Sequence, residues 1–185
     1  MKLRNLVTPA VMALLLSISG LSWAGNGENL LQFVPDNNAI VVHVNLEQVR
    51  STPMYEMIWG MAETSTDFQS VMGELETTVG FNPSTDLSSL LIAVDGENEQ
   101  DLIMLVEGNF EAARISTFLA GRAEVSAVDY QGQTMYYTEE GNINLNTNTT
   151  EPAYFSFLNN QIVAAGTQAS VQRAINLHRG EGDSI

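Results

Sequence analysis

The sequence contains no cysteine and, beyond its second residue, no lysine. Without cysteine the chain forms no disulfide, has no thiolate nucleophile, and cannot carry the lipid of a bacterial lipoprotein. Its fold must therefore depend on burial and hydrogen bonding alone. A hydrophobic fraction of 44% is enough for one domain of ordinary size.

Positive charge is scarce throughout the chain. There are 22 acidic and 7 basic residues, or 22 against 5 once Lys2 and Arg4 are removed, which leaves a formal charge of −17. A surface of this sign repels nucleic acid and anionic lipid headgroups, so we expect neither as a partner. The missing lysine also excludes a Gly-x-x-x-x-Gly-Lys phosphate loop.

Only two histidines are present, which limits metal and nucleophile chemistry. Neither His43 nor His178 has a second histidine four residues away, as zinc sites of the His-Glu-x-x-His type need, and no Gly-x-Ser-x-Gly elbow occurs. His43 lies in a predicted strand and His178 in the last turn of a predicted helix, where half-exposed and helix-terminal structural roles are the favoured interpretations. We therefore predict no catalytic residue and no cofactor.

The N-terminus has the three parts of a secretory signal peptide. Lys2 and Arg4 precede an apolar run over residues 6–18, and Ser22-Trp23-Ala24 provides small residues at the two positions that a signal peptidase inspects. The alternative, an uncleaved membrane anchor, requires a longer stretch with fewer polar interruptions. We expect a signal peptide over residues 1–24 and a mature protein that is periplasmic or secreted.

Hydrophobic periodicity predicts the order of the elements. Alternating β-branched residues predict a strand over residues 39–46, and i, i+3, i+4 spacing predicts helices between residues 54 and 79 that end at Gly80. Asn109 is expected to cap a later helix, and Thr167 the last one. Three hairpins are predicted between paired runs, at residues 89–94 with 102–106, 125–129 with 134–138, and 153–158 with 161–165.

This order predicts an α+β fold. We expect a mainly antiparallel sheet with helices on one face, related to the split βαβ arrangement of ferredoxin-like folds. Residues 25–185 are expected to form a single domain without internal repeats. The polar stretch over residues 142–151 is expected to be an exposed loop.

Further landmarks are strand openings, caps and turns. The pattern Phe-Val-Pro-x-x-x-Ala-x-Val-Val-x-Val-Asn-Leu occupies residues 33–46, with additional segments at residues 51–55, 80–83, 86–87, 108–110 and 113–114. Together they resemble a family of exported bacterial proteins of unknown function. The resemblance spans most of the mature chain and implies no substrate. Because members commonly continue into a second similar unit, it implies that this chain is a short form or the first half of a two-unit protein.

One acidic loop is a weak metal candidate. Hard cations such as Ca²⁺ take oxygen ligands, and four alternating carboxylates occupy the first hairpin link, namely Asp95, Glu97, Glu99 and Asp101. However, Gln100 stands where an EF-hand needs glycine, and Val106 stands where it needs a bidentate glutamate. A solvated hairpin tip is the favoured alternative, because unpaired charge runs are usually hydrated surface.

The predicted helices after residue 52 are rich in methionine and aromatic residues. Flexible thioethers suit adaptable binding surfaces, so we select as binding candidates Met54, Tyr55, Met57, Trp59 and Met61. The alternative is that these side chains fill the core between helices and sheet.

These features favour an exported, non-enzymatic envelope protein that binds another envelope component, such as another envelope protein. Two other hypotheses stay open. One is a hydrolase that uses a pair of acidic residues in a cleft. The other is a calcium-dependent binding module centred on residues 95–101.

Overall fold

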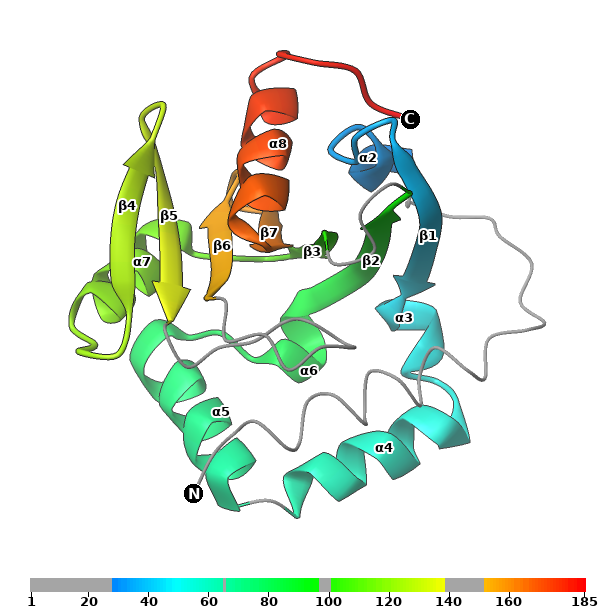
Figure 1. The fold of residues 1–185 in the computed structure, drawn as a ribbon. Coiled ribbons are helices and arrows are strands. Elements are labelled where there is room, and N and C mark those ends of the chain that lie inside the picture. The colour runs from blue at the N-terminus through cyan, green and yellow to red at the C-terminus, as the bar shows by residue number, and fades with distance from the viewer. Residues whose placement is uncertain (1–27, 65, 97–100, 139–151) are drawn as a thin grey trace.

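The structure, a computed structural model, describes residues 28–64, 66–96, 101–138 and 152–185 (Figure 1). Its centre is a seven-stranded sheet of order β1-β2-β3-β7-β6-β5-β4, in which every neighbouring pair is antiparallel. This confirms the predicted α+β class and the mainly antiparallel sheet. The strands are β1 (Asn38–Asn45), β2 (Leu87–Asp95), β3 (Leu102–Gly108), β4 (Ser126–Tyr130), β5 (Gln133–Thr138), β6 (Ala153–Phe157) and β7 (Ile162–Gly166).

The helices lie mostly in two stretches of the chain, between β1 and β2 and around the later hairpins. They are α2 (Glu28–Leu31), α3 (Leu46–Val49), α4 (Pro53–Glu63), α5 (Thr66–Val79), α6 (Pro83–Asp86), α7 (Ala112–Ala120) and α8 (Gln168–His178). Within the described ranges, no helix combines the length and the hydropathy needed to cross a bilayer.

Local signals placed most of these elements correctly. Gly80 follows α5 with φ +71°, a left-handed conformation that glycine adopts without steric cost. Thr167 caps α8, because its side chain accepts a hydrogen bond from the backbone N–H of Ser170. In the turn between β4 and β5, Gln131 and Gly132 both have positive φ, as a two-residue hairpin turn requires.

The connection after β3 decides the topology. Consecutive strands are neighbours everywhere except here, where α7 leads from β3 to β4 at the far edge of the sheet. The β4 to β7 meander then returns until β7 pairs with β3, with Ile103 opposite Gly166. The backbones are so close at this point that a Cβ on Gly166 would collide with the Leu102 carbonyl oxygen.

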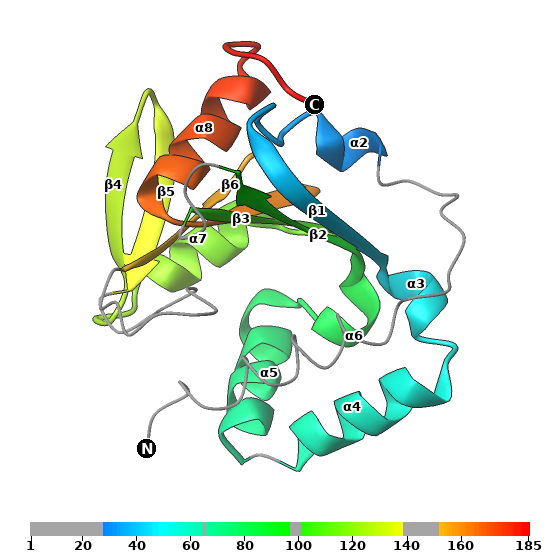
Figure 2. The same ribbon diagram turned by 45° about the vertical axis from the view of Figure 1, so that its right-hand side comes forward.

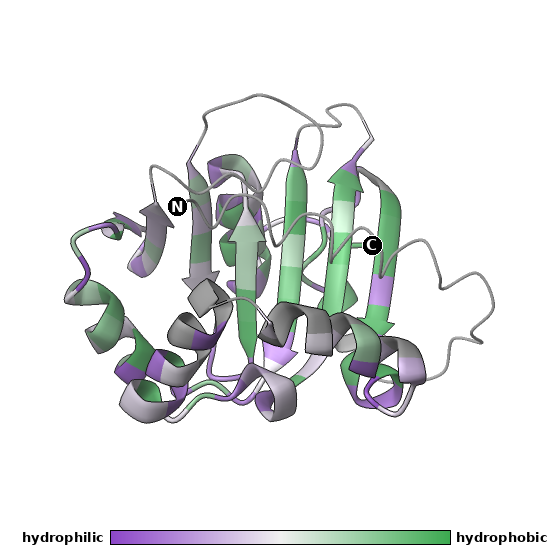
Figure 3. Cartoon of the chain, turned by 90° about the horizontal axis from the view of Figure 1, so that it is seen from below, coloured by the Kyte–Doolittle hydropathy of each residue, from purple (hydrophilic) through white to green (hydrophobic). Residues whose placement is uncertain are grey.

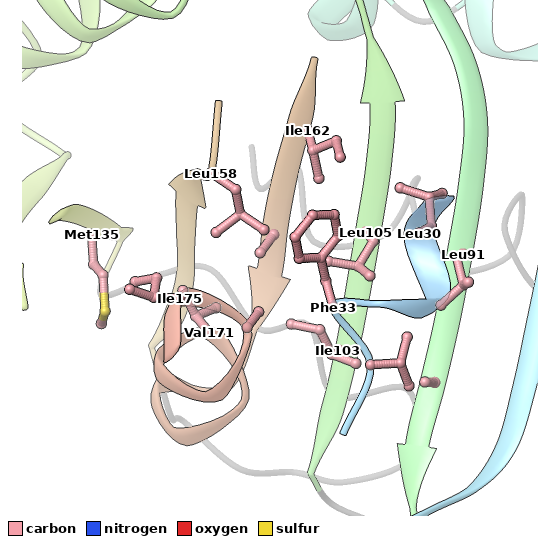
Figure 4. Close-up of a cluster of buried hydrophobic side chains, with 14 residues drawn as sticks. Leu30, Phe33, Leu91, Ile103, Leu105, Met135, Leu158, Ile162, Val171 and Ile175 are labelled. Atoms are coloured by element: carbon pink, nitrogen blue, oxygen red, sulfur yellow. The ribbon is translucent and has the colours of Figure 1, made fainter. Parts of the chain in front are cut away.

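One face of the sheet is covered by α2 and α8 and holds the larger core cluster (Figure 4). Leu91 of β2 and Leu105 of β3 are opposite one another and completely buried. From α8, Val171 and Ile175 pack over this face, while Leu30 and Phe33 cover its β2 side from α2 and the turn that follows.

The opposite face holds a second cluster, beneath α7 and the end of α5. Val106 and Val163, which alternate with the residues of the first cluster, pack there with Val79, Phe110 and Ile115. The expectation of helices on one face is therefore wrong. The reason is that the central strands of the sheet are apolar on both sides, so helices must pack on each face to bury it.

One other expectation also needs correction. The N-cap of α7 is Glu111 and not Asn109, because the backbone N–H groups of Asn109 and Phe110 bond to carbonyls of Asp86 and Asn160 instead. The short helices α2, α3 and α6 have too few residues to show a helical period, and they were not predicted. The loop expected at residues 142–151 lies outside the described residues.

Candidate functional site

The predicted binding candidates lie on α4, which stands apart from the sheet (Figure 2). Before its first turn, the Thr52 hydroxyl accepts a hydrogen bond from the backbone N–H of Tyr55 at 3.3 Å, which fixes the start of the helix. Helix α4 packs chiefly on α5, and none of its described side chains belongs to either core cluster. The central strands of the sheet are rich in hydrophobic residues (Figure 3).

Two aromatic rings and one methionine define the described surface of α4. Tyr55 and Trp59 are one helical turn apart and stack with a centroid distance of 5.8 Å and an interplanar angle of 11°. The Met57 residue is 61% exposed, so it does not fill the core. The side chains of Met54 and Met61 lie outside what the structure describes. Met57 is two residues from each ring, so it lies on a different side of the helix. We call the part of α4 that Tyr55, Met57 and Trp59 form, on both sides of the helix, the α4 surface.

Helix α5 carries α4 and is attached to the body by its C-terminal half. Val79 packs against Phe110 and Ile115, and the Glu74 carboxylate forms an ion pair with Arg122. Arg114 of α7 donates a hydrogen bond to the Thr78 carbonyl oxygen at 3.2 Å. These contacts fix the end of α5, and α4 is presented at the other end of the helical pair (Figure 2).

The sequence suggested that the acidic loop is either a solvated hairpin tip or a calcium-binding loop. The two ends of the loop lie in an environment that differs from both. Asp95 and Asp101, at the ends of β2 and the link, are only 5% and 8% exposed. Asp101 accepts hydrogen bonds from the hydroxyls of Thr167 and Ser170 and from the guanidinium of Arg173, all from the start of α8. Asp95 accepts from the Asn37 amide, and its carboxylate lies 3.7 Å from Arg173 Nη2.

These contacts determine the charge state of Asp101. Burial by itself raises its pKa, but the hydrogen bonds from Ser170, Thr167 and Arg173, with the charge of Arg173, outweigh burial and lower the pKa below its ordinary value. The carboxylate is therefore ionised and is bound to α8.

The two ends of the loop are thus not a solvated hairpin tip. Glu97 and Glu99 lie outside the described residues. Among the residues that are described, no group of three histidine, aspartate or glutamate side chains is close enough together to hold a metal ion. Asp95 and Asp101 instead attach the first hairpin to α8.

The two histidines lie in different elements, His43 on β1 and His178 in the last turn of α8. His43 faces the α2 and α8 side of the sheet, where Ser89 is its diagonal neighbour on β2 and Glu107 is opposite Ser89 on β3. Two strand spacings, about 9–10 Å, therefore separate the backbones of His43 and Glu107. Burial lowers the pKa of His43. His178 packs its ring against Phe33 with a centroid distance of 5.7 Å.

Sequence reasoning missed the role of the arginines. All five beyond residue 24 join separate elements or ends of elements. Arg50 donates to the Leu87 carbonyl oxygen, Arg179 to the Gln131 carbonyl oxygen, and Arg114, Arg122 and Arg173 make the contacts given above. The three-residue spacing of Thr167, Ser170 and Arg173 was a visible signal, since it places one polar stripe on the first turns of a helix.

Comparisons with known proteins give little beyond this geometry. No protein-family model and no curated protein matches the sequence. Among solved structures, crystal form III of TP0453 has a TM-score of 0.48 at 10% identity, with 79% of this chain and 51% of that chain covered. Crystal form IV gives 0.47 at 8% identity, covering 79% and 52%. This chain therefore spans about half the length of TP0453, and a likeness of this degree supports no functional conclusion.

Proposed function

We propose that this chain is an exported, non-enzymatic protein of the bacterial envelope that binds another envelope component through the α4 surface. The observation that carries the proposal is the exposure of Met57 on a helix that is held away from the core. Covering such a side chain in an interface contributes about 1–2 kcal/mol, a gain that α4 does not obtain within its own chain.

The aromatic pair adds to this argument. Tyr55 and Trp59 form a stacked unit of two rings that loses little conformational freedom on binding. Aromatic and methionine side chains are enriched at the centres of protein interfaces. The α4 surface therefore has the composition of a binding site for another protein.

Electrostatics support a partner that is not anionic. Each of the five arginines beyond residue 24 is engaged within the fold. An anionic lipid surface or a nucleic acid would have to displace one of these contacts, so neither is the partner we propose.

The other two hypotheses have less support. Asp95 and Asp101 are the described pair of buried carboxylates, and Arg173 lies against both. A guanidinium in that position leaves these two acids committed to α8 rather than to a cation or a water nucleophile. We therefore do not assign a hydrolase or a calcium module to them.

The relation to ferredoxin-like folds is likewise a proposal. It is supported by the β3–α7–β4 crossover, which joins two parallel strands that have β7, β6 and β5 between them. Such a crossover is a split βαβ unit with three strands inserted rather than one.

The proposed binding can be tested by site-specific crosslinking in the native envelope. A photo-crosslinking residue replaces Met57 in one variant and Val128, which is 40% exposed on the edge strand β4, in a control. The expected result is an adduct specific to position 57. Its partner, identified by mass spectrometry and purified, should bind the Met57→Glu protein about tenfold more weakly than the wild type or Val128→Glu. Identical adducts from both positions would refute a role for α4.

A further inference from the structure

Strand β4 forms one edge of the sheet and is exposed on both faces (Figures 1 and 2). Its three central residues, Ala127, Val128 and Asp129, are all exposed, although successive side chains of a strand point to opposite faces. Val128 is an apolar side chain with 40% exposure. Within the fold, β4 is therefore held mainly by its pairing with β5.

The backbone of β4 has hydrogen-bonding groups that face away from β5. The two-residue turn at Gln131 and Gly132 makes Tyr130 the first residue of β4 to exchange hydrogen bonds with β5. Alternation then directs the N–H and C=O groups of Ala127 and Asp129 away from the sheet. In the part of the chain that the structure describes, these groups bond to no other element. They are available to a further strand.

Natural sheets protect their edges with lysine, proline or bulges, and β4 has none of these. Its one charged side chain, Asp129, accepts a hydrogen bond from the backbone N–H of Gly132 at 3.2 Å and so stabilises the turn. The other edge strand, β1, has an irregular register between Asn38 and Ile40. Strand β4 is thus the less protected edge of the sheet.

Positive charge, which is scarce in this chain, is present at both ends of β4. Before the strand, Arg122 lies 3.6 Å from Glu124. After it, Arg179 donates to the Gln131 carbonyl oxygen in the turn and lies 3.3 Å from Glu181. An antiparallel second copy brings the end with Arg179 beside the end with Glu124, so both signs meet at each end. This limits the repulsion between two chains of formal charge −17.

The strand is also complementary to itself. In an antiparallel pair of β4 strands, Ala127 of each copy exchanges backbone hydrogen bonds with Asp129 of the other. Val128 then lies on the two-fold axis opposite Val128 of the second copy, at a non-hydrogen-bonded position where side chains are closest. Ser126 lies opposite Tyr130, so no acid faces another. The alternative register that pairs Asp129 with itself is disfavoured, because like charges directly opposite repel.

We propose that two copies of this chain associate through β4, antiparallel and with Val128 on the two-fold axis, so that one sheet continues through both. This inference goes beyond the proposed function, because β4 and α4 lie on different sides of the molecule (Figure 1). The interface consists of a short strand pair and the Val128 contact. Because such an interface is small, the dimer is weak and forms as the protein concentration rises.

The absence of cysteine allows a clean disulfide test. Val128→Cys places a thiol on the two-fold axis, where the two Cα atoms are about 4.5 Å apart and a disulfide fits. In Ala127→Cys the two Cα atoms are about 8–9 Å apart, too far for a disulfide. Ile40→Cys, at a 59% exposed residue of the opposite edge, reports random collisions. In a glutathione buffer, Val128→Cys should form linked dimers at least about tenfold faster than either control.

Sedimentation velocity tests the association without a crosslink. The average mass of the mature protein should rise toward that of a dimer with increasing concentration. Ala127→Pro removes an N–H that faces away from β5, so it spares the β4–β5 ladder and should weaken association at least about tenfold. Ala127→Ser keeps this N–H and should associate like the wild type. Circular dichroism melts verify that both variants are folded.

Each result decides for or against the β4 pair. A protein that stays monomeric at every concentration, equal linking by the three cysteine variants, or unchanged association of Ala127→Pro would overturn it. In the native envelope, a photo-crosslinking residue at position 128 should join the chain to a second copy, at twice its mass. An adduct with a different protein there would make β4 a site for a foreign strand and would also overturn self-pairing. None of these results depends on position 57, so the proposed function is tested separately.

Discussion

The attachment of α8 to the first hairpin should depend strongly on Asp101. Three donors from α8 converge on this carboxylate, which is 8% exposed. Replacing Asp101 by asparagine keeps the size of the side chain but removes its charge and turns an amide N–H₂ toward donors. The change therefore leaves the hydroxyls and Arg173 without an anionic acceptor.

The size of the destabilisation depends on how exposed the partners of Asp101 are. Removing one member of a buried ion pair costs about 3–5 kcal/mol of unfolding free energy. The Arg173 side chain is 36% exposed, so it can turn toward water and recover part of that loss. We therefore expect Asp101→Asn to lower the unfolding free energy by about 2–3 kcal/mol, and Ser170→Ala by about 1 kcal/mol.

Urea denaturation of the mature protein measures these changes. The matched control is Asp183→Asn, at an exposed acid of the C-terminal tail, which should remain within about 0.5 kcal/mol of the wild type. A double-mutant cycle of Asp101→Asn with Arg173→Met should give a coupling energy of about 1–2 kcal/mol. If Asp101→Asn is no more destabilising than Asp183→Asn, the carboxylate does not hold α8 and the reasoning fails.

The same carboxylate makes stability depend on acid pH. Its folded-state pKa is lower than the unfolded value of 3.8, so its contribution is complete above pH 3.8 and is lost as pH falls through the folded pKa. Asp101→Asn should remove this part of the acid transition. The pKa of His43 is also lowered from 6.5, because burial disfavours its charged form, so the unfolding free energy also decreases as pH falls below 6.5. This decrease occurs at a higher pH than the one due to Asp101. The two can therefore be separated in one pH series.

Four further predictions concern other parts of the chain. Raising NaCl to molar concentration should raise the melting temperature, because screening weakens repulsion among 22 acids opposed by 5 bases, and a flat or falling midpoint would contradict this. Millimolar CaCl₂ should stabilise the protein no more than NaCl of equal ionic strength, and a calcium-specific shift abolished by Asp95→Asn would show a bound ion. Gly166→Ala should destabilise by more than about 2 kcal/mol in urea melts, because a Cβ there meets the Leu102 carbonyl, whereas Gly60→Ala, with open space around it, is the control. Expressed with its signal, the mature protein should begin at Gly25 by intact mass, and retention of Met1 would support an anchor.

Several features were determined by the sequence because they depend on neighbours only a few residues apart. Alternation of apolar residues specified most of the strands, and Gly132 with its neighbours specified a hairpin turn. Thr167 predicted the start of α8 because a cap acts on a backbone N–H three residues away. The methionine-rich composition of α4 was equally visible, but not the exposure of Met57.

The tertiary structure decided what depends on distant partners. Alternation shows that Leu105 and Val106 face opposite sides, but not that α8 covers one side and α7 the other. From the sequence, residues 95–101 were interpreted as a solvated tip, with a cation loop as the weaker alternative, because the partners of Asp101 lie 66, 69 and 72 residues further along the chain. Charge interactions fall off with distance in space and not along the sequence, so only the fold could bring that carboxylate under α8 and leave Met57 in solvent.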